Sequence, residues 1–156
     1  MRRNIVLVIL CPAVLVSACR GRAPYAGKSA AELERMLGDP NPTVQAQGAY
    51  GLSRLGAEAR SAVPALVDAL KKSRPVRQNA ALALGQMGRH ARDAVPALCE
   101  ALGDSDWAVR RQAALALGKI GAEARSAIPA LQRLSRDPDR LVRSAAITGR
   151  LVAPPR

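Results

Sequence analysis

The sequence predicts an all-α protein, a short solenoid of four stacked helical hairpins with about eight helices. The main observation is a segment that occurs in three similar copies, of which the clearest is VRRQAALALGKIGAEARSAIPAL from Val109 to Leu131. Its first valine recurs at spacings of 32, 33 and 33 residues, at Val44, Val76, Val109 and Val142. Self-similarity at this period is typical of solenoids, in which each unit completes its core against its neighbours. The composition agrees, because the chain has no Phe, one Trp and two Tyr, and no segment shows the alternation of a strand.

Each repeat is expected to hold two helices separated by glycine and proline signals. The helix that begins near the valine, called the inner helix here, is expected to end at Gly56, Gly88 and Gly121. The outer helix of the next hairpin has a first-turn proline three residues after a predicted N-cap, at Ser61, Asp93 and Ser126. A second set of predicted N-caps precedes the inner helices, at Asn41, Ser73, Asp106 and Asp139.

These signals divide the chain into a repeat domain at residues 29–153, with units at 29–55, 61–87, 93–120 and 126–151. The spacing of Ser29 and Glu32 predicts a capping box at the start of the first helix. The last unit is more polar, since Thr148 and Arg150 replace leucines of the earlier copies. A polar final unit is what the end of a solenoid requires.

The repeated residues resemble a known family, the HEAT-like repeats of the E–Z or phycobilisome-lyase type. The pattern of that family is VRxxAAxALGxxG followed by AVPAL, and the resemblance covers Ser29 to about Arg150. It implies an α-solenoid. It implies no single function, because the same repeat serves enzymes, adaptors and scaffolds.

Residues 1–18 are expected to be a cleaved lipoprotein signal peptide. Arg2 and Arg3 precede an apolar stretch, residues 5–16, that is too short to span a bilayer comfortably. The next residues, Val-Ser-Ala-Cys ending at Cys19, resemble a bacterial lipobox. This resemblance implies a diacylglyceryl thioether on Cys19, usually with a third chain such as palmitate on its amine. The alternative is an ordinary secretory signal with a chance cysteine.

Lipidation would place the chain in the bacterial cell envelope, with residues 19–28 as a flexible tether. Arg20 directly follows the cysteine. In sorting of the enterobacterial kind, this residue favours the periplasmic face of the outer membrane over the inner membrane.

The inner helices are expected to line the concave side of the solenoid and to carry the candidate partner site. With the valine as position zero and about 100° per residue, position 6 points away from the core; it holds Tyr50, Leu82, Leu115 and Thr148. Polar, basic and aromatic residues surround this line, namely Arg54, Gln78, Arg111, Lys119 and Trp107. An apolar line with such a rim is a candidate groove for a partner helix or extended segment. The alternative is that Leu82 and Leu115 pack only against the neighbouring inner helix.

Position 1 of the inner helices is predicted to carry a structural ladder. It holds Gln45, Arg77, Arg110 and Arg143. The family resemblance implies that such an arginine bonds across repeats to an aspartate before the next inner helix, here Asp104 or Asp137. The ladder is expected to be incomplete, because Gln45 and Lys72 interrupt it in the first two units.

No enzymatic site, metal or cofactor is expected. The sequence has no Gly-rich phosphate loop and no Ser/His/Asp set, and it lacks the His-Glu pairs of deoxyhypusine hydroxylase, an enzyme with similar repeats. His90 is expected to be a structural loop residue and Cys99 a small buried apolar residue. Nucleic acid is not expected as a partner, because an exported chain does not meet it and stacking aromatics are scarce.

The sequence therefore indicates a membrane-anchored extracytoplasmic scaffold that binds a protein partner of unknown identity. The net charge of +12 favours an acidic partner, although arginines that merely face solvent give the same composition. The alternative is a structural envelope protein whose basic surface contacts anionic lipid or polymer. A remote alternative is a regulatory subunit or a lyase-like HEAT protein.

Overall fold

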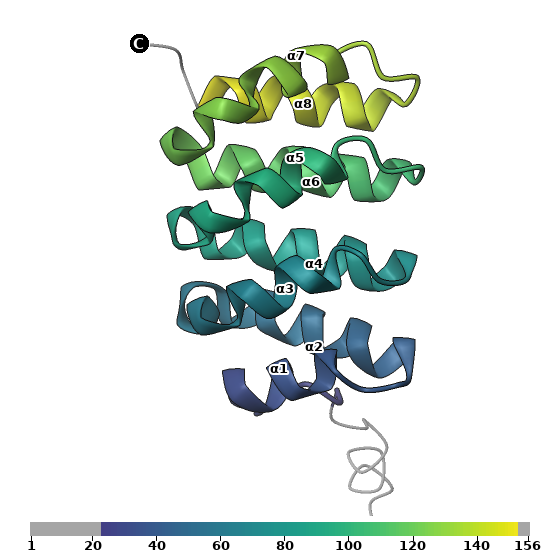
Figure 1. Ribbon diagram of the computed structural model, residues 1–156, viewed down its shortest axis with the longest axis vertical. Helices are drawn as coiled ribbons and strands as arrows, with labels where there is room; N and C mark the ends of the chain where they lie inside the picture. Colours follow the sequence, from purple (N-terminus) through teal and green to yellow (C-terminus); the bar gives the residue numbers. More distant parts are fainter. Residues whose placement is uncertain (1–22, 153–156) are drawn as a thin grey trace, which may run out of the picture.

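The computed structural model describes residues 23–152, with side chains through Arg150. Eight α-helices in this part of the chain form four hairpins stacked in a single row (Figure 1). The outer helices are α1 (Ala30–Leu37), α3 (Val63–Ala69), α5 (Val95–Ala101) and α7 (Ile128–Leu134). The inner helices, called the inner row below, are α2 (Pro42–Leu55), α4 (Arg74–Met87), α6 (Trp107–Ile120) and α8 (Arg140–Val152). Residues 23–152 contain no strand, and the predicted all-α solenoid is confirmed.

Short 3₁₀ segments join each hairpin to the next. They are η2 (Gly56–Ala62), η3 (Gly88–Ala94) and η4 (Gly121–Ala127). The first glycine of each segment has a positive φ, of 55°, 56° and 78° respectively. A side chain disfavours that conformation, so glycine ends each inner helix as the sequence predicts.

The prediction that Ser61, Asp93 and Ser126 cap the outer helices is wrong. All three lie inside the 3₁₀ segments, and an alanine without a side-chain cap immediately precedes α3, α5 and α7. The 3₁₀ turns run directly into the α-helix, so carbonyls of the link accept the first hydrogen bonds. The amide of Val63, for example, donates to the carbonyl of Arg60. A side-chain oxygen is therefore not needed at these helix starts.

The caps of α1 and of three inner helices form as predicted. Ser29 and Glu32 make a capping box, with the Ser29 amide 2.8 Å from Glu32 Oε2. The side chains of Asn41, Asp106 and Asp139 accept bonds of 2.8–2.9 Å from amides two residues later. Ser73 makes no such bond. The loop that ends at Ser73 is one residue shorter than the loop before α6, which accounts for the spacing of 32 residues between Val44 and Val76.

Successive inner helices approach closely because glycine and alanine occupy their contact faces. A Cβ atom added at Gly85 would lie 2.9 Å from the Cα of Ala116, and one added at Gly118 would lie 2.7 Å from the Cα of Gly149. Neither position has room for a side chain. Fully buried leucines from both rows fill the space between the helices, and include Leu52, Leu84, Leu117, Leu66, Leu98 and Leu131.

The two ends of the row of hairpins differ in how far their residues are covered. At the N-terminal end, the ring of Tyr25 lies 5.0 Å from that of Tyr50 in an edge-to-face arrangement. Residues 23–28, which the sequence assigns to a flexible tether, therefore include a residue that packs on α2. At the C-terminal end Thr148 and Arg150 are exposed, and Leu141 and Ile147 are 48% and 46% exposed.

We expect Gly118→Val to lower the free energy of unfolding by about 2–3 kcal/mol, because the new side chain would overlap the α8 backbone at Gly149. Gly103→Val is the control, since Gly103 lies in an exposed turn and its added Cβ would meet its nearest atom at 3.4 Å. The control should change stability by no more than about 0.5 kcal/mol. Urea denaturation measures both values, and equal losses would contradict close packing of α6 on α8.

Candidate functional site

The apolar line predicted at position 6 lies beside two hollows in the inner row. Tyr50, Leu82 and Leu115 are half-buried, and Thr148 is exposed. A hollow of about 430 Å³ between α2 and α4 is lined by Tyr50 and Leu82. A second hollow of about 190 Å³, between α4 and α6, is lined by Leu82 and Leu115. Leu82 lines both, so the hollows are neighbours along the row; together they are called the inner-row groove.

Leu115 also packs against the hydrophobic core. Packing between inner helices and lining of a groove are therefore compatible roles for this leucine. Leu82 lines both hollows and is the residue that they have in common.

Polar groups border the inner-row groove. Arg54 and Gln86 line the first hollow, and Gln112 and Lys119 line the second. Lys119 Nζ donates a 3.0 Å hydrogen bond to Gln86 Oε1, which joins α6 to α4. The structure thus brings two of the predicted cations, Arg54 and Lys119, to the apolar line. Gln86 closes the rim between them.

The other predicted rim residues lie outside the two hollows. Gln78 and Arg111 are half-buried, one turn before Leu82 and Leu115 on their helices. Trp107 begins α6 and is 41% exposed. Sequence reasoning missed Ser53, a buried residue that lines the first hollow and donates a 2.7 Å hydrogen bond to the carbonyl of Tyr50.

Two arginines of the inner row form rungs between repeats. Arg77 binds both oxygens of Asp104, at 2.7 and 3.0 Å, and also donates to the carbonyl of Lys72. Arg110 binds both oxygens of Asp137, at 2.8 and 3.0 Å, and donates to the carbonyl of Asp104. Each arginine therefore joins the loop before its own helix to the loop of the next unit. Such paired, planar contacts are geometrically specific.

The ladder has the gap predicted at Gln45 and Lys72, but the prediction that Arg143 belongs to it is wrong, because no aspartate of a further unit follows α8 in this sequence. Gln45 donates to the carbonyl of Asp39 in its own loop, and Lys72 donates to the carbonyl of Leu37 in the preceding unit. Arg143 donates to the carbonyls of Asp137 and Pro138. These groups satisfy the backbone of the loops without a carboxylate partner.

The rungs shift the pKa of both aspartates downward. Burial alone would raise the pKa of Asp104, but hydrogen bonds from Arg77 and from the Asp106 amide outweigh it and hold the pKa below 3.8. Hydrogen bonds from Arg110 lower the pKa of Asp137 in the same way, against the effect of burial. Both rungs therefore stabilise the fold fully above the ordinary aspartate pKa, and this contribution disappears as the pH falls through the lowered values.

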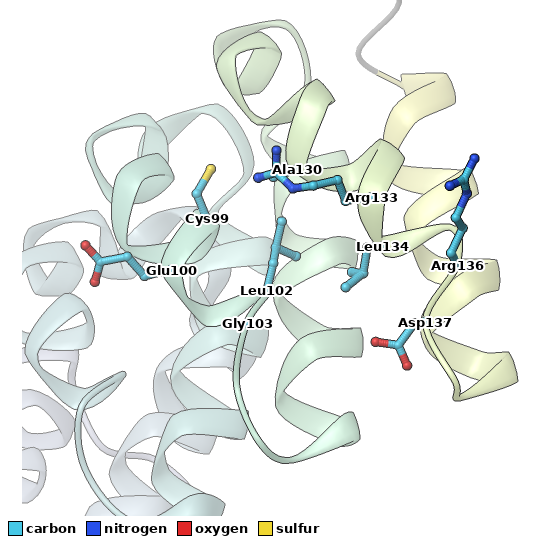
Figure 2. Close-up of a pocket in the computed structure, with 9 residues that line it drawn as sticks. All are labelled: Cys99, Glu100, Leu102, Gly103, Ala130, Arg133, Leu134, Arg136 and Asp137. Atoms are coloured by element: carbon cyan, nitrogen blue, oxygen red, sulfur yellow. The ribbon is translucent and has the colours of Figure 1, made fainter.

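A separate pocket of about 330 Å³ lies between the outer helices α5 and α7 (Figure 2). Figure 2 shows the Arg133 side chain extending from α7 toward α5 beside Leu102. Cys99 lines this pocket and is half-buried, whereas the sequence predicts a buried residue. Burial raises the pKa of its thiol, which keeps the sulfur protonated and weakly nucleophilic.

Other expectations concern the links and the N-terminus. His90 is exposed in η3, beside Arg89, Arg92, Asp93 and Glu123. Within residues 23–152, no three His, Cys, Asp or Glu side chains gather as metal ligands would. No helix in the same part of the chain is both long enough and apolar enough to cross a bilayer. Cys19 and the signal segment lie outside the described residues.

The repeat of helical hairpins agrees with a family comparison. A family model described as HEAT repeats matches residues 63–149, more than half of the chain. The chain is a HEAT repeat protein. No curated protein matches it in sequence.

Engineered and designed proteins are among the solved structures similar to this HEAT repeat protein. An engineered protein has a TM-score of 0.65 and 24% identity, over 77% of this chain and 60% of that one. A designed armadillo repeat protein in complex with the peptide (KR)4 has a TM-score of 0.66 and 19% identity, over 75% and 61%. A computationally designed armadillo repeat protein for modular peptide recognition gives 0.63 and 21%, over 75% and 61%. The HEAT chain thus spans about three fifths of the length of each.

We expect Arg110→Ala to destabilise the HEAT array by about 3 kcal/mol, because it leaves the Asp137 carboxylate, 5% exposed, without its cation. Arg125→Ala is the matched control, since Arg125 is exposed in η4. This control should stay within about 0.5 kcal/mol of wild type. Thermal and urea unfolding give both values, and a loss at Arg125 as large as at Arg110 would contradict the rung.

The rungs also predict a pH dependence. The stability difference between wild type and Asp104→Asn/Asp137→Asn should be constant above about pH 5 and should shrink as the pH falls below the ordinary aspartate value of 3.8. Melting temperatures from pH 7 to pH 2.5 measure this difference. A gap that widens toward low pH would have the wrong sign for aspartates with lowered pKa values.

Proposed function

We propose that this HEAT repeat protein is a scaffold that holds a protein partner along the inner-row groove and performs no chemistry on it. The observation that carries the proposal is the half-buried line of Tyr50, Leu82 and Leu115, which lines adjacent hollows between packed helices. Half-buried apolar groups with a polar rim suit a protein interface, because they release water on contact and the helices need not rearrange.

The comparison with designed repeats supports this use of the fold. A designed armadillo repeat protein of similar architecture forms a complex with a peptide. The groups that line the groove here are aliphatic, aromatic, amide and cationic. Groups of these kinds bind and orient a partner.

The proposal includes a lipid anchor at Cys19, supported by the signal-like segment of residues 1–18 and the lipobox-like residues that end at this cysteine. Burial of an acyl chain contributes about 0.8 kcal/mol per CH₂, so two or three chains hold a protein firmly on a membrane. Confinement at the periplasmic face of the outer membrane would raise the effective concentration of the groove for a partner nearby.

A structural role in the envelope is the second candidate, favoured by exposed arginines on the last hairpin. Arg133, Arg136, Arg140 and Arg150 are all exposed. A surface that holds anionic lipid or polymer by charge alone releases it as the ionic strength rises. Retention of a defined protein in high salt therefore favours the scaffold over this candidate.

Tyr50→Ala, Leu82→Ala and Leu115→Ala should each reduce recovery of the partner while the chain stays folded, because they remove the apolar line. Leu134→Ala is the matched control, a half-buried leucine on the outer helix α7. Crosslinking in intact cells followed by pull-down in high salt and mass spectrometry measures recovery, and circular dichroism monitors folding. Unchanged recovery from folded groove variants would refute the groove.

Cys19→Ser should move the protein from the membrane fraction to the soluble envelope fraction, because the acyl chains would have no thiol to join. Cys99→Ser is the control and should remain with the membrane. Fractionation of cells with immunodetection distinguishes the two variants. A membrane-bound Cys19→Ser variant would contradict anchoring at this cysteine.

A further inference from the structure

We propose that the groove selects an extended acidic segment of its partner, with carboxylates that meet Arg54, Arg111 and Lys119. The inference rests on the proposed function, because it specifies the chemistry of what the inner-row groove binds. It is carried by the distribution of charge over the helices and by the spacing of the two hollows.

Acidic residues are absent from every inner helix. All 12 Asp and Glu residues of the chain lie in outer helices, links and loops, and none lies in α2, α4, α6 or α8. The same four helices contain Arg54, Arg74, Arg77, Arg110, Arg111, Lys119, Arg140, Arg143 and Arg150. Every charged side chain within these helices is therefore positive, and, in the part of the chain that the structure describes, the cations without a carboxylate partner lie on α2, α6 and α8.

Three carboxylates near the inner row are already paired with cations at the loop edge. Asp104 and Asp137 bind Arg77 and Arg110, and Asp106 binds Arg74 at 2.6 Å. Within residues 23–152, by contrast, Arg54, Arg111 and Lys119 form no ion pair. A cationic rim with no counter-charge of its own favours a negatively charged occupant.

The spacing of the hollows favours an extended chain. Packed helices lie about 8–10 Å apart, so hollows between successive helix pairs are separated by about that distance. An extended chain of the polyproline II type advances about 3.1 Å per residue with three residues per turn, so apolar side chains three positions apart lie on one face about 9 Å apart and reach both hollows. A partner helix advances only about 1.5 Å per residue, so it would need apolar residues about six or seven positions apart to reach both hollows. The proposed occupant is the extended segment, with apolar residues at i and i+3 and acidic residues around them.

A selection from a random displayed peptide library on the full-length protein tests this inference. Enriched peptides should carry net negative charge and apolar residues three positions apart. Synthetic versions should bind Arg54→Glu/Arg111→Glu/Lys119→Glu about tenfold more weakly than wild type, or weaker still. Arg60→Glu/Arg92→Glu/Arg125→Glu, which changes the exposed link arginines, is the control and should bind as wild type does. Circular dichroism confirms that both variants are folded.

The possible outcomes distinguish a failure of the acidic specificity from a failure of the groove as a binding site. Enrichment of neutral or basic peptides that lose binding on Leu82→Ala would overturn the acidic specificity and leave the groove intact. Acidic peptides that lose binding equally in the link variant would show general charge attraction and would also overturn it. Apolar spacing of six or seven residues would indicate a helix in place of an extended segment. No enrichment on wild type would contradict the proposed function and this inference together.

Discussion

The row of inner helices depends on the absence of side chains where one helix crosses the next. At Gly85 and Gly118 the backbone of the following helix lies 2.9 and 2.7 Å from where a Cβ atom would be. Small residues at these contacts allow close approach and let the leucines on either side fill the core. The same approach places Leu82 between two neighbouring hollows. It also brings the loop of each unit within reach of the arginine before it, so the groove and the rungs follow from one packing constraint.

The charged residues of the solenoid have two roles, one in stabilising the stack and one at the groove. The aspartates at the loop edge accept backbone amides of their own loop and the guanidinium of the preceding unit, as at Asp104 and Asp137. Their pKa values are lowered accordingly, and these carboxylates stabilise the stack. The inner helices, having no carboxylates, leave the cations near the groove available to another molecule. Rigid helices fix the backbone positions of those cations, which reduces the ordering that a partner must impose on binding.

The sequence predicted the parts of the fold that depend on local chemistry and period. The repeat of Val76 and Val109, the helix-ending glycines and the cap at Asp106 follow from spacing and backbone preference. The cap at Ser61 could not be predicted, because continuity between a 3₁₀ turn and a helix depends on backbone geometry. The hollows beside Leu82 and the packing of Tyr25 on Tyr50 depend on distances between helices, which a helical period does not supply. The pairing of Arg110 with Asp137 came from the family resemblance rather than from spacing.

Site-directed photo-crosslinking in cells tests most directly whether the inner row is the binding face. A photoreactive residue at Gln86, exposed beside the first hollow, is compared with one at Gln132, exposed on α7 of the outer row. The account predicts one defined protein adduct from Gln86 that persists in high salt and is absent from Gln132. Adducts at Gln132 alone, or the same adducts from both positions, would contradict a partner held by the inner-row groove.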